Sequence, residues 1–249
     1  MAQSAYGKIR IFEDFLAGED IVAATAVGRA FGGSGLRVIG QGSEDTDSGI
    51  TVGEADGLDG VGILTTTNED AHSIGLTTGK VFDVGKMGTI AMECRVQFPD
   101  LDTKAFYFGL TDVNDDTVIL EGTNLVAAGA NLTLTASDLC GFLLDAEATD
   151  DEDWIMVYNG GTTTGETTIA NIDADDDAVA GEFQVLRLEV ESNGTARWYI
   201  DGDLKQTVKG AVSTSTDFAV LLMVEAKGAA IEAMDVDYVL IESNRDWTA

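Results

Sequence analysis

Histidine, proline and cysteine are almost absent from this 249-residue chain. His72 and Pro99 are the only residues of their kinds, and Cys94 and Cys140 are the only cysteines. Two cysteines do not make a disulfide framework, and zinc sites and His-dependent nucleophilic catalysis need histidines or spaced cysteines. The sequence therefore predicts no catalytic residue of that kind and no transition-metal site. We expect His72 at the surface, and both cysteines as free thiols in the core because they lie in apolar stretches.

Basic residues are also scarce, with 14 Lys and Arg against 44 Asp and Glu and a formal net charge of −30. Because each phosphate contact needs a cation, this charge argues against nucleic acid as a partner and against anionic membranes. The longest apolar run, Phe218 to Val224, is far shorter than the ~20 residues of a membrane span. The N-terminal residues lack the apolar core of a signal peptide. We therefore expect synthesis and folding in a cytoplasm.

Residues 186–208 carry the clearest structural pattern of the sequence. Leu186, Leu188 and Val190 alternate with charged residues, as they do in a half-buried strand. A three-residue loop at 192–194 would place Leu188 opposite Trp198 and Glu189 opposite Arg197, whereas a two-residue loop would mix the two faces. That loop needs a residue with positive φ at its end, where Gly194 stands. The stretch thus predicts an antiparallel hairpin over an apolar core.

Short strands separated by turn signals are expected along most of the chain. No stretch has a convincing amphipathic helical pattern, so the fold class is all-β, an antiparallel β-sandwich. The first strand is expected to pair with the last, in which Met234, Val236, Tyr238 and Leu240 share one face. The predicted strands are 8–12, 36–39, 50–52, 62–66, 72–76, 90–98, 106–110, 140–145, 154–158, 167–172, 186–190, 196–200, 218–225 and 234–241.

The chain is expected to form one domain with two parts. Residues 1–60 supply a first strand and a Gly-rich arm that packs on the sandwich or extends from it, and residues 61–249 form the sandwich. Within the first part, residues 20–31 are compatible with a short helix or an extended arm. Residues 118–136 are Gly-, Ala- and Thr-rich and are predicted to leave the sheet. Long, weakly patterned segments of this kind often contact other chains.

Acidic runs suggest metal or glycosidase sites, but none matches its template. Residues 173–177 are expected as an acidic loop and have the alternating acids of a calcium loop, yet Ala178 and Gln184 stand where Gly and Glu are required. A loose surface calcium site stays open there as the alternative to a solvated loop. Residues 112–116 fail in the same way. Residues 54–59 come nearest to the E-x-D-x-x-E strand of sandwich glucanases but end in Asp, and no Glu completes Asp235 and Asp237. The sequence therefore predicts no catalytic residue, no metal site and no cofactor.

Exposed aromatic residues are a further signal in the sequence, because sugar binding uses them beside polar groups. Trp154, Tyr158 and Trp247 are candidates for such contacts, whereas Trp198 is in phase with the core. A buried role is the commoner one for such side chains. The sequence leaves both roles open for the three candidates.

Five segments of the chain resemble a known family of proteins. They are IFEDFL near the N-terminus and residues 92–112, 140–168, 186–202 and 234–246. In their order and strand patterns they are similar to virion structural proteins of tailed bacteriophages that carry a concanavalin A-like (laminin G-like) jelly roll. The resemblance implies a jelly-roll sandwich and a capsid decoration, cement or minor capsid protein that binds and stabilises the outer shell. It offers no catalytic residues to carry over.

This resemblance also implies partners and a location. We expect the chain to bind the major capsid protein or other virion proteins, to form a homo-oligomer and to lie on the capsid surface. The arm at residues 13–45 is our candidate for attachment, by strand pairing or an ordered loop. Two alternatives remain open, a lectin-like carbohydrate-binding module and, less favoured, a glucanase-like glycosidase.

Overall fold

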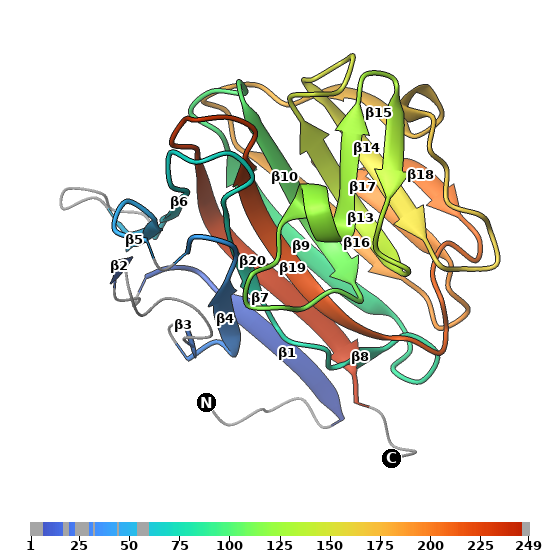
Figure 1. Cartoon of the computed structure of the whole chain (residues 1–249). Helices are drawn as coiled ribbons and strands as arrows, with labels where there is room; N and C mark the ends of the chain where they lie inside the picture. The colour runs from blue at the N-terminus through green and yellow to red at the C-terminus, as the bar shows by residue number, and fades with distance from the viewer. Residues whose placement is uncertain are drawn as a thin grey trace.

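The fold is an antiparallel β-sandwich, as the sequence predicts. The computed structural model describes residues 7–16, 20–22, 30–31, 33–43, 45–53 and 60–245. Figure 1 shows two large sheets, A and B, stacked face to face over a common core. No helix among the described residues is long and apolar enough to cross a lipid bilayer.

Sheet A is open to solvent on its outer face. Along its strands, buried residues alternate with partly exposed ones, so that only one face packs on the core. The first strand pairs with the last, as expected, with Ile11 opposite Ile241. The strands follow the order β18 (Asp203–Val208), β17 (Ala196–Ile200), β16 (Gln184–Val190), β9 (Ile90–Gln97), β20 (Ala233–Asn244), β6 (Gly62–Thr65), β5 (Gly49–Val52) and β2 (Ile21–Val22), and β1 (Lys8–Glu13) pairs with β20.

The β16–β17 hairpin has the register that the sequence predicts. Leu188 lies opposite Trp198, Glu189 lies opposite Arg197, and Gly194 has a φ of 79°. The Trp198 side chain is fully buried, and its Nε1 donates a hydrogen bond to the carbonyl oxygen of Gly141 in sheet B at 2.8 Å. The hairpin therefore also ties the two sheets together.

Sheet B is buried on both faces. Every residue of β7, β10 and β13 is buried, which requires a cover on each side. Trp154 lies on the inner face, 5.6 Å from Phe106 between ring centroids. The strands follow the order β15 (Asp173–Asp177), β14 (Asp153–Asn159), β13 (Leu139–Asp145), β10 (Lys104–Thr111), β19 (Asp217–Ala226), β7 (Ser73–Thr77), β4 (Leu36–Ile39) and β3 (Ala30–Phe31), and β8 (Phe82–Asp83) pairs with β19.

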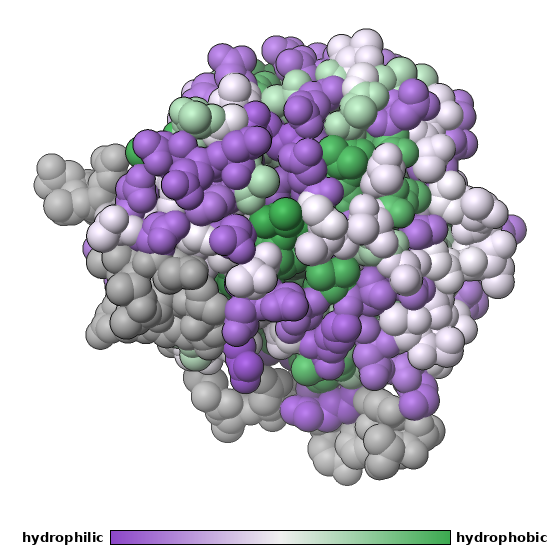
Figure 2. All heavy atoms as spheres, viewed as in Figure 1, coloured by the Kyte–Doolittle hydropathy of each residue, from purple (hydrophilic) through white to green (hydrophobic). Residues whose placement is uncertain are grey.

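The outer face of sheet B is covered by residues 118–136, the segment predicted to leave the sheet. This segment contains a π-helix, η1 (Leu120–Asn124), and a separate hairpin of β11 (Leu125–Ala128) and β12 (Asn131–Leu134). In Figure 1 a short helical turn lies in front of the sheet on this side. Figure 2 shows the same face mostly hydrophilic or neutral, with hydrophobic residues in small areas. The buried apolar side chains of this cover are Val118, Leu120, Leu125, Ala127, Leu132 and Ala136.

A buried carboxylate anchors the cover to sheet B. Glu225, on β19, accepts hydrogen bonds from the backbone N–H groups of Leu120 and of Glu121, the latter at 3.1 Å. Lys227 lies 3.8 Å from Asp145, whose side chain is also buried. Burial raises the pKa of Glu225 to about 7 and also raises the pKa of Asp145. The buried surroundings of Glu225 and Asp145 therefore disfavour the charged form of both carboxyl groups.

Two predicted elements between residues 167 and 177 are wrong. Residues 173–177, expected as an acidic loop, form the edge strand β15, where Asp176 pairs with Lys205 at 2.7 Å. Residues 167–172, expected as a strand, contain a single 3₁₀ turn, η2 (Ile169–Asn171). Acids are rare in strands because they rarely fit a half-buried surface, but an edge strand exposes them to water.

The first 60 residues contribute strands to both sheets. β5 joins sheet A and β4 joins sheet B, both at positions where the sequence predicts strands. Of the segment 20–31, left open between a helix and an extended arm, the described parts are Asp20 and the strands β2 and β3. Residues 17–19 and 23–29 lie outside the described ranges.

The pKa of Glu225 predicts a specific pH dependence of stability. Because folding raises this pKa from its ordinary value near 4.5 to about 7, the folded state prefers the protonated carboxyl. The contribution of Glu225 is therefore fully present below about pH 4.5 and is lost as the pH rises through about 7, on the order of 3 kcal/mol in all. Urea unfolding of the wild type and of Glu225→Gln, from about pH 5 to about pH 8.5, measures it.

The wild type should lose stability relative to Glu225→Gln as the pH rises across that range. The matched control is Glu182→Gln, at an exposed glutamate, whose unfolding free energy should follow the wild type at every pH. Parallel curves for the wild type and Glu225→Gln would show that the carboxyl of Glu225 does not titrate in this window.

Candidate functional site

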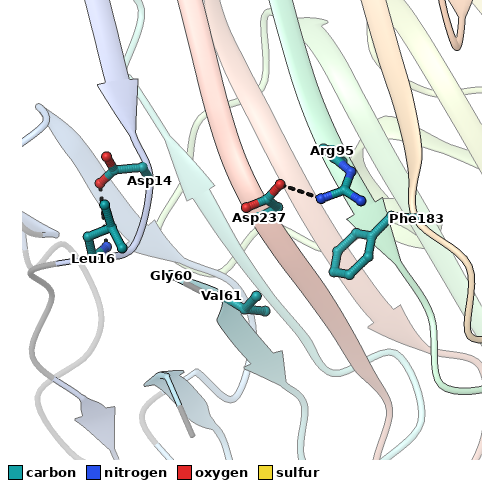
Figure 3. A pocket seen from close by; sticks show the side chains of 7 residues that line it. All are labelled: Asp14, Leu16, Gly60, Val61, Arg95, Phe183 and Asp237. Atoms are coloured by element: carbon teal, nitrogen blue, oxygen red, sulfur yellow. Dashed lines mark hydrogen bonds and ion pairs between the residues drawn. The ribbon is translucent and has the colours of Figure 1, made fainter. Parts of the chain in front are cut away.

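An open hollow on the outer face of sheet A is the strongest candidate site. It has a volume of about 370 Å³, and its walls come from β9, β20, the end of β1 and the residues before β6. Figure 3 shows Arg95, Asp237 and Phe183 on one side of it, with Asp14, Leu16 and Val61 on the other. Since sheet B is covered, this face presents side chains from several strands directly to water.

Arg95 organises one wall of this hollow. Its Nη1 donates a hydrogen bond to Oδ2 of Asp237 at 2.6 Å, and its guanidinium carbon lies 4.3 Å from the centroid of the Phe183 ring. A guanidinium placed over an aromatic face is attracted by the ring quadrupole, and an ion pair fixes its orientation. The hollow thus combines an aromatic ring, a planar cation and a carboxylate in one fixed arrangement.

A β-bulge in β20 brings Asp237 to this position. Val236 lies opposite Val96, but Tyr238 lies opposite Arg95, so that Asp237 is the extra residue. A bulge of this kind re-aims side chains, and such bulges are frequent beside functional sites. Both Asp237 and Tyr238 are therefore partly exposed.

The bulge makes the predicted face of the last strand wrong beyond Val236. Met234 and Val236 are buried as expected, but Tyr238 and Leu240 are not, and Val239 and Ile241 take the buried positions. One extra residue inverts every later side chain because strand residues alternate with a period of two.

Tyr238 continues the polar surface from this hollow along β9. Its hydroxyl donates a hydrogen bond to Oε1 of Glu93 at 2.7 Å, and Nη1 of Arg187 donates to Oε2 of the same carboxylate at 3.1 Å. Burial, together with the negative charge of Glu93, raises the pKa of Tyr238 well above its ordinary value. Tyr238 is therefore neutral and acts as a hydrogen-bond donor.

The opposite wall is set by a buried phenylalanine. Phe15 has a φ of 53°, and its ring lies in the core 5.4 Å from that of Phe31. The neighbouring Leu16 is 68% exposed, and its N–H donates to Oδ1 of Asp14 at 3.4 Å. The left-handed backbone at Phe15 thus presents an apolar and an acidic side chain at the rim.

The sequence indicated only part of this site. Asp237 lines the hollow, whereas Asp235, its predicted neighbour, does not. Trp154 and Tyr158, considered for sugar contacts, are buried, and Trp247 and residues 54–59 lie outside the described residues. Arg95 and Phe183 were missed, since one charged residue facing outward from a strand is ordinary and Phe183 lies outside the predicted strands.

His72 is more enclosed than predicted. Its side chain is 16% exposed and packs against Gly42, where a Cβ atom would lie 2.2 Å from Nδ1. Nε2 lies 3.1 Å from Glu69, and Nδ1 lies 2.8 Å from the Thr67 hydroxyl and 3.6 Å from Asp45. The two carboxylates are nearest to different ring nitrogens, and both are largely exposed. His72 thus lies between two carboxylates and a hydroxyl group.

The acids of β15 form no group of metal ligands. Among the residues that the structure describes, Asp45, Glu69 and His72 make up the one group with three ligand atoms close together. Asp153 on β14 lies opposite Asp177 on β15. Burial is the main cause that raises the pKa of Asp153 to about 7, and the neighbouring carboxyl of Asp177 is the next cause. A carboxyl in this state can share a proton across the strand pair.

Comparisons with known proteins identify the fold of the chain but show no family for it. No protein-family model and no curated protein matches the chain. Solved structures do match it, and they include concanavalin A-like lectin and glycanase sandwiches. The concanavalin A-like β-sandwich predicted from the resemblance is therefore confirmed.

Three similar structures illustrate the match. A structure of the endo-acting O-glycanases with which human gut bacteria initiate mucin breakdown is 12% identical, with a TM-score of 0.57 over 93% of this chain and 98% of that one. The carbohydrate recognition domain of Emp47p is 9% identical, with a TM-score of 0.54 over 98% and 100%. A protein of unknown function, SO2946 from Shewanella oneidensis MR-1, is 12% identical, with a TM-score of 0.54 over 97% and 89%. At these identities the likeness extends to the fold alone.

The exposure of this site predicts that its side chains contribute little to stability. We expect Phe183→Ala and Asp237→Asn each to change the free energy of unfolding by less than about 1 kcal/mol, since partly exposed ion pairs and rings are weak contributors. The control Phe106→Ala, in the core, should cost about 3–5 kcal/mol. Urea unfolding provides the measurement, and a loss of more than about 3 kcal/mol in either site variant would make the hollow a structural feature.

Proposed function

We propose that this protein binds carbohydrate as a lectin-like module, through the hollow around Arg95. The observation that carries the proposal is the combination of Phe183 with the Arg95–Asp237 pair in an open hollow. Sites for small polar ligands join aromatic surface with a few fixed polar groups in this way. The guanidinium and the carboxylate can donate to and accept from neighbouring sugar hydroxyls, while apolar sugar faces lie against the ring.

The similar structures support this class of ligand. They include a carbohydrate recognition domain and an O-glycanase acting on mucin, so sandwiches of this shape serve both recognition and cleavage of glycans. Fold alone does not assign a function, and the proposal therefore rests on the side chains of the hollow.

We propose further that the protein does not hydrolyse what it binds. Glycoside hydrolysis by two carboxyl groups requires one of them to protonate the leaving oxygen. In the hollow, Asp237 is engaged by Arg95, and Asp14 accepts the N–H of Leu16. Neither carboxylate is placed as a proton donor, which favours binding over catalysis.

Glycan binding is tested directly with an array followed by calorimetry on the best ligand. We expect Phe183→Ala and Asp237→Asn each to weaken binding at least about tenfold, because each removes one half of the arrangement. Matched controls outside the hollow are Val81→Ala and Asp217→Asn, both at exposed positions.

Two results would contradict the proposal. A wild type that retains no glycan, or site variants that bind as tightly as the controls, would exclude the hollow as a carbohydrate site. Release of reducing sugar from the bound glycan would show that the protein is an enzyme instead.

A second candidate is the predicted virion decoration protein, bound to the outer shell of a phage capsid. The observation that favours it is exposed apolar surface at the predicted attachment arm, where Leu16 is 68% exposed, and at Phe12 just before the arm, which is 44% exposed. Exposed apolar side chains of this size often mark contacts with a partner. In this proposal the protein acts at the capsid surface, and the major capsid protein or another virion protein covers Leu16.

Co-sedimentation with capsids of a phage that encodes the protein tests this second function. We expect Leu16→Glu to reduce capsid binding at least about tenfold, since a charge would be buried at the contact. Val179→Glu, at an exposed apolar residue elsewhere, should bind like the wild type. A wild type that stays in the supernatant would refute this role.

A further inference from the structure

A second hollow lies on the same open face of sheet A. It has a volume of about 310 Å³ and is formed where β1, β9, β16 and β20 run side by side. Three cations, Lys8, Arg10 and Arg187, line it together with the acids Glu189 and Glu242. The proposed carbohydrate site therefore has a neighbour with a distinct chemical character.

The charge of this second hollow is opposite to that of the whole chain. Its cations exceed its acids by one, although the chain carries a formal charge of −30 and only 14 basic residues. In the first hollow the balance is reversed, because Asp14 and Asp237 face the single cation Arg95. The open face of sheet A is thus polar along its length, and its cations are most numerous beside β1.

The two hollows are aligned on one strand. Ala91 lines the second hollow and Arg95 lines the first, and both lie on the outer side of β9. Four residues of strand separate them by ~13 Å, which is longer than one sugar ring. A ligand that occupies both hollows must therefore be an oligosaccharide.

The surface between the two hollows suits such a chain. The rings of Phe12 and Tyr238 lie 6.3 Å apart there, tilted against one another. Glu93 joins the two ends, because it accepts a hydrogen bond from Tyr238 and another from Arg187. Aromatic faces and a fixed acceptor are what a sugar ring between the hollows would contact.

Arg187 is held in a fixed orientation by two carboxylates, Glu189 and Glu93. Its Nε and Nη2 donate to Oε1 of Glu189 at 2.9 and 2.7 Å, which fixes the plane of the guanidinium. Arg10 pairs with Glu242 at 3.3 Å, and both side chains are more than half exposed. Because exposed pairs are weak, a ligand oxyanion can compete for Arg10 at little cost. Guanidinium groups bind such oxyanions in a bidentate manner.

We propose that the bound glycan is acidic, and that its oxyanion, a carboxylate or a sulfate ester, lies in the hollow lined by Lys8, Arg10 and Arg187. This inference rests on the proposed carbohydrate-binding function and assigns its ligand class. The neutral part of the same oligosaccharide occupies the hollow of Arg95 and Phe183.

Matched pairs of polysaccharides test the charge requirement in the full-length protein. Polygalacturonate oligosaccharides are compared with their methyl esters, and carrageenan oligosaccharides with their desulfated form. We expect the wild type to bind at least one charged member at least about tenfold more tightly than its neutral partner. The pair that shows the preference identifies carboxylate or sulfate as the anion, and added salt should weaken that binding.

Variants then locate the anion. Lys8→Gln combined with Arg10→Gln should lower affinity for the charged ligand about tenfold and lower affinity for its neutral partner much less. Arg187→Gln should act in the same direction, and Arg187→Lys should restore part of the loss because it keeps the charge. The matched control is Lys80→Gln, at an exposed lysine outside both hollows.

The possible failures are distinguishable. Equal binding of charged and neutral partners would overturn the inference and leave the carbohydrate-binding function standing. A preference for the charged ligand that survives in the double variant would place the anion elsewhere and also overturn the inference. Absence of binding to any glycan, on the array and in both pairs, would overturn the proposed function itself.

Discussion

The structure depends on one constraint, which is that sheet B must be covered on both faces. Its strands are apolar on both sides, so sheet A packs against one face and the segment around η1 packs against the other. Sheet A has polar or charged residues on alternate positions and needs only one apolar neighbour. The open face of the molecule, and with it both hollows, follows from this difference between the two sheets.

The cover is fixed by polar contacts rather than by area alone. Glu225 accepts hydrogen bonds from two backbone N–H groups at the start of η1. The first N–H groups of a helix have no partner within the helix, because no turn precedes them. The buried carboxylate stabilises the docking of the segment but is itself disfavoured by desolvation. That conflict raises its pKa, and it makes the docking of the cover sensitive to pH.

The sequence was sufficient for the parts of the fold that follow a strict period. The register of the β16–β17 hairpin could be predicted because a slip by one residue would have buried Glu189 and Arg197. The bulge at Asp237 could not, since nothing local distinguishes it from a regular strand, and it reverses the faces of Tyr238 and Leu240. The acids of β15 were expected in a loop because Asp has a low strand propensity. The sequence does not show that this strand lies at the edge of the sheet, where acids are tolerated.

The candidate site was less predictable than the fold for a related reason. Arg95 and Phe183 are far from Asp237 in the sequence and meet only because β9 and β20 are neighbours in the sheet. Their side chains face water. The alternation of residues along a strand predicts which side chains are exposed, but not which of them contact one another. The charges show the same dependence, because a chain with a net charge of −30 gathers Arg10, Arg95 and Arg187 on one face only after its strands are paired. Pairing of distant strands thus creates both the polarity of this face and its capacity to bind an extended ligand.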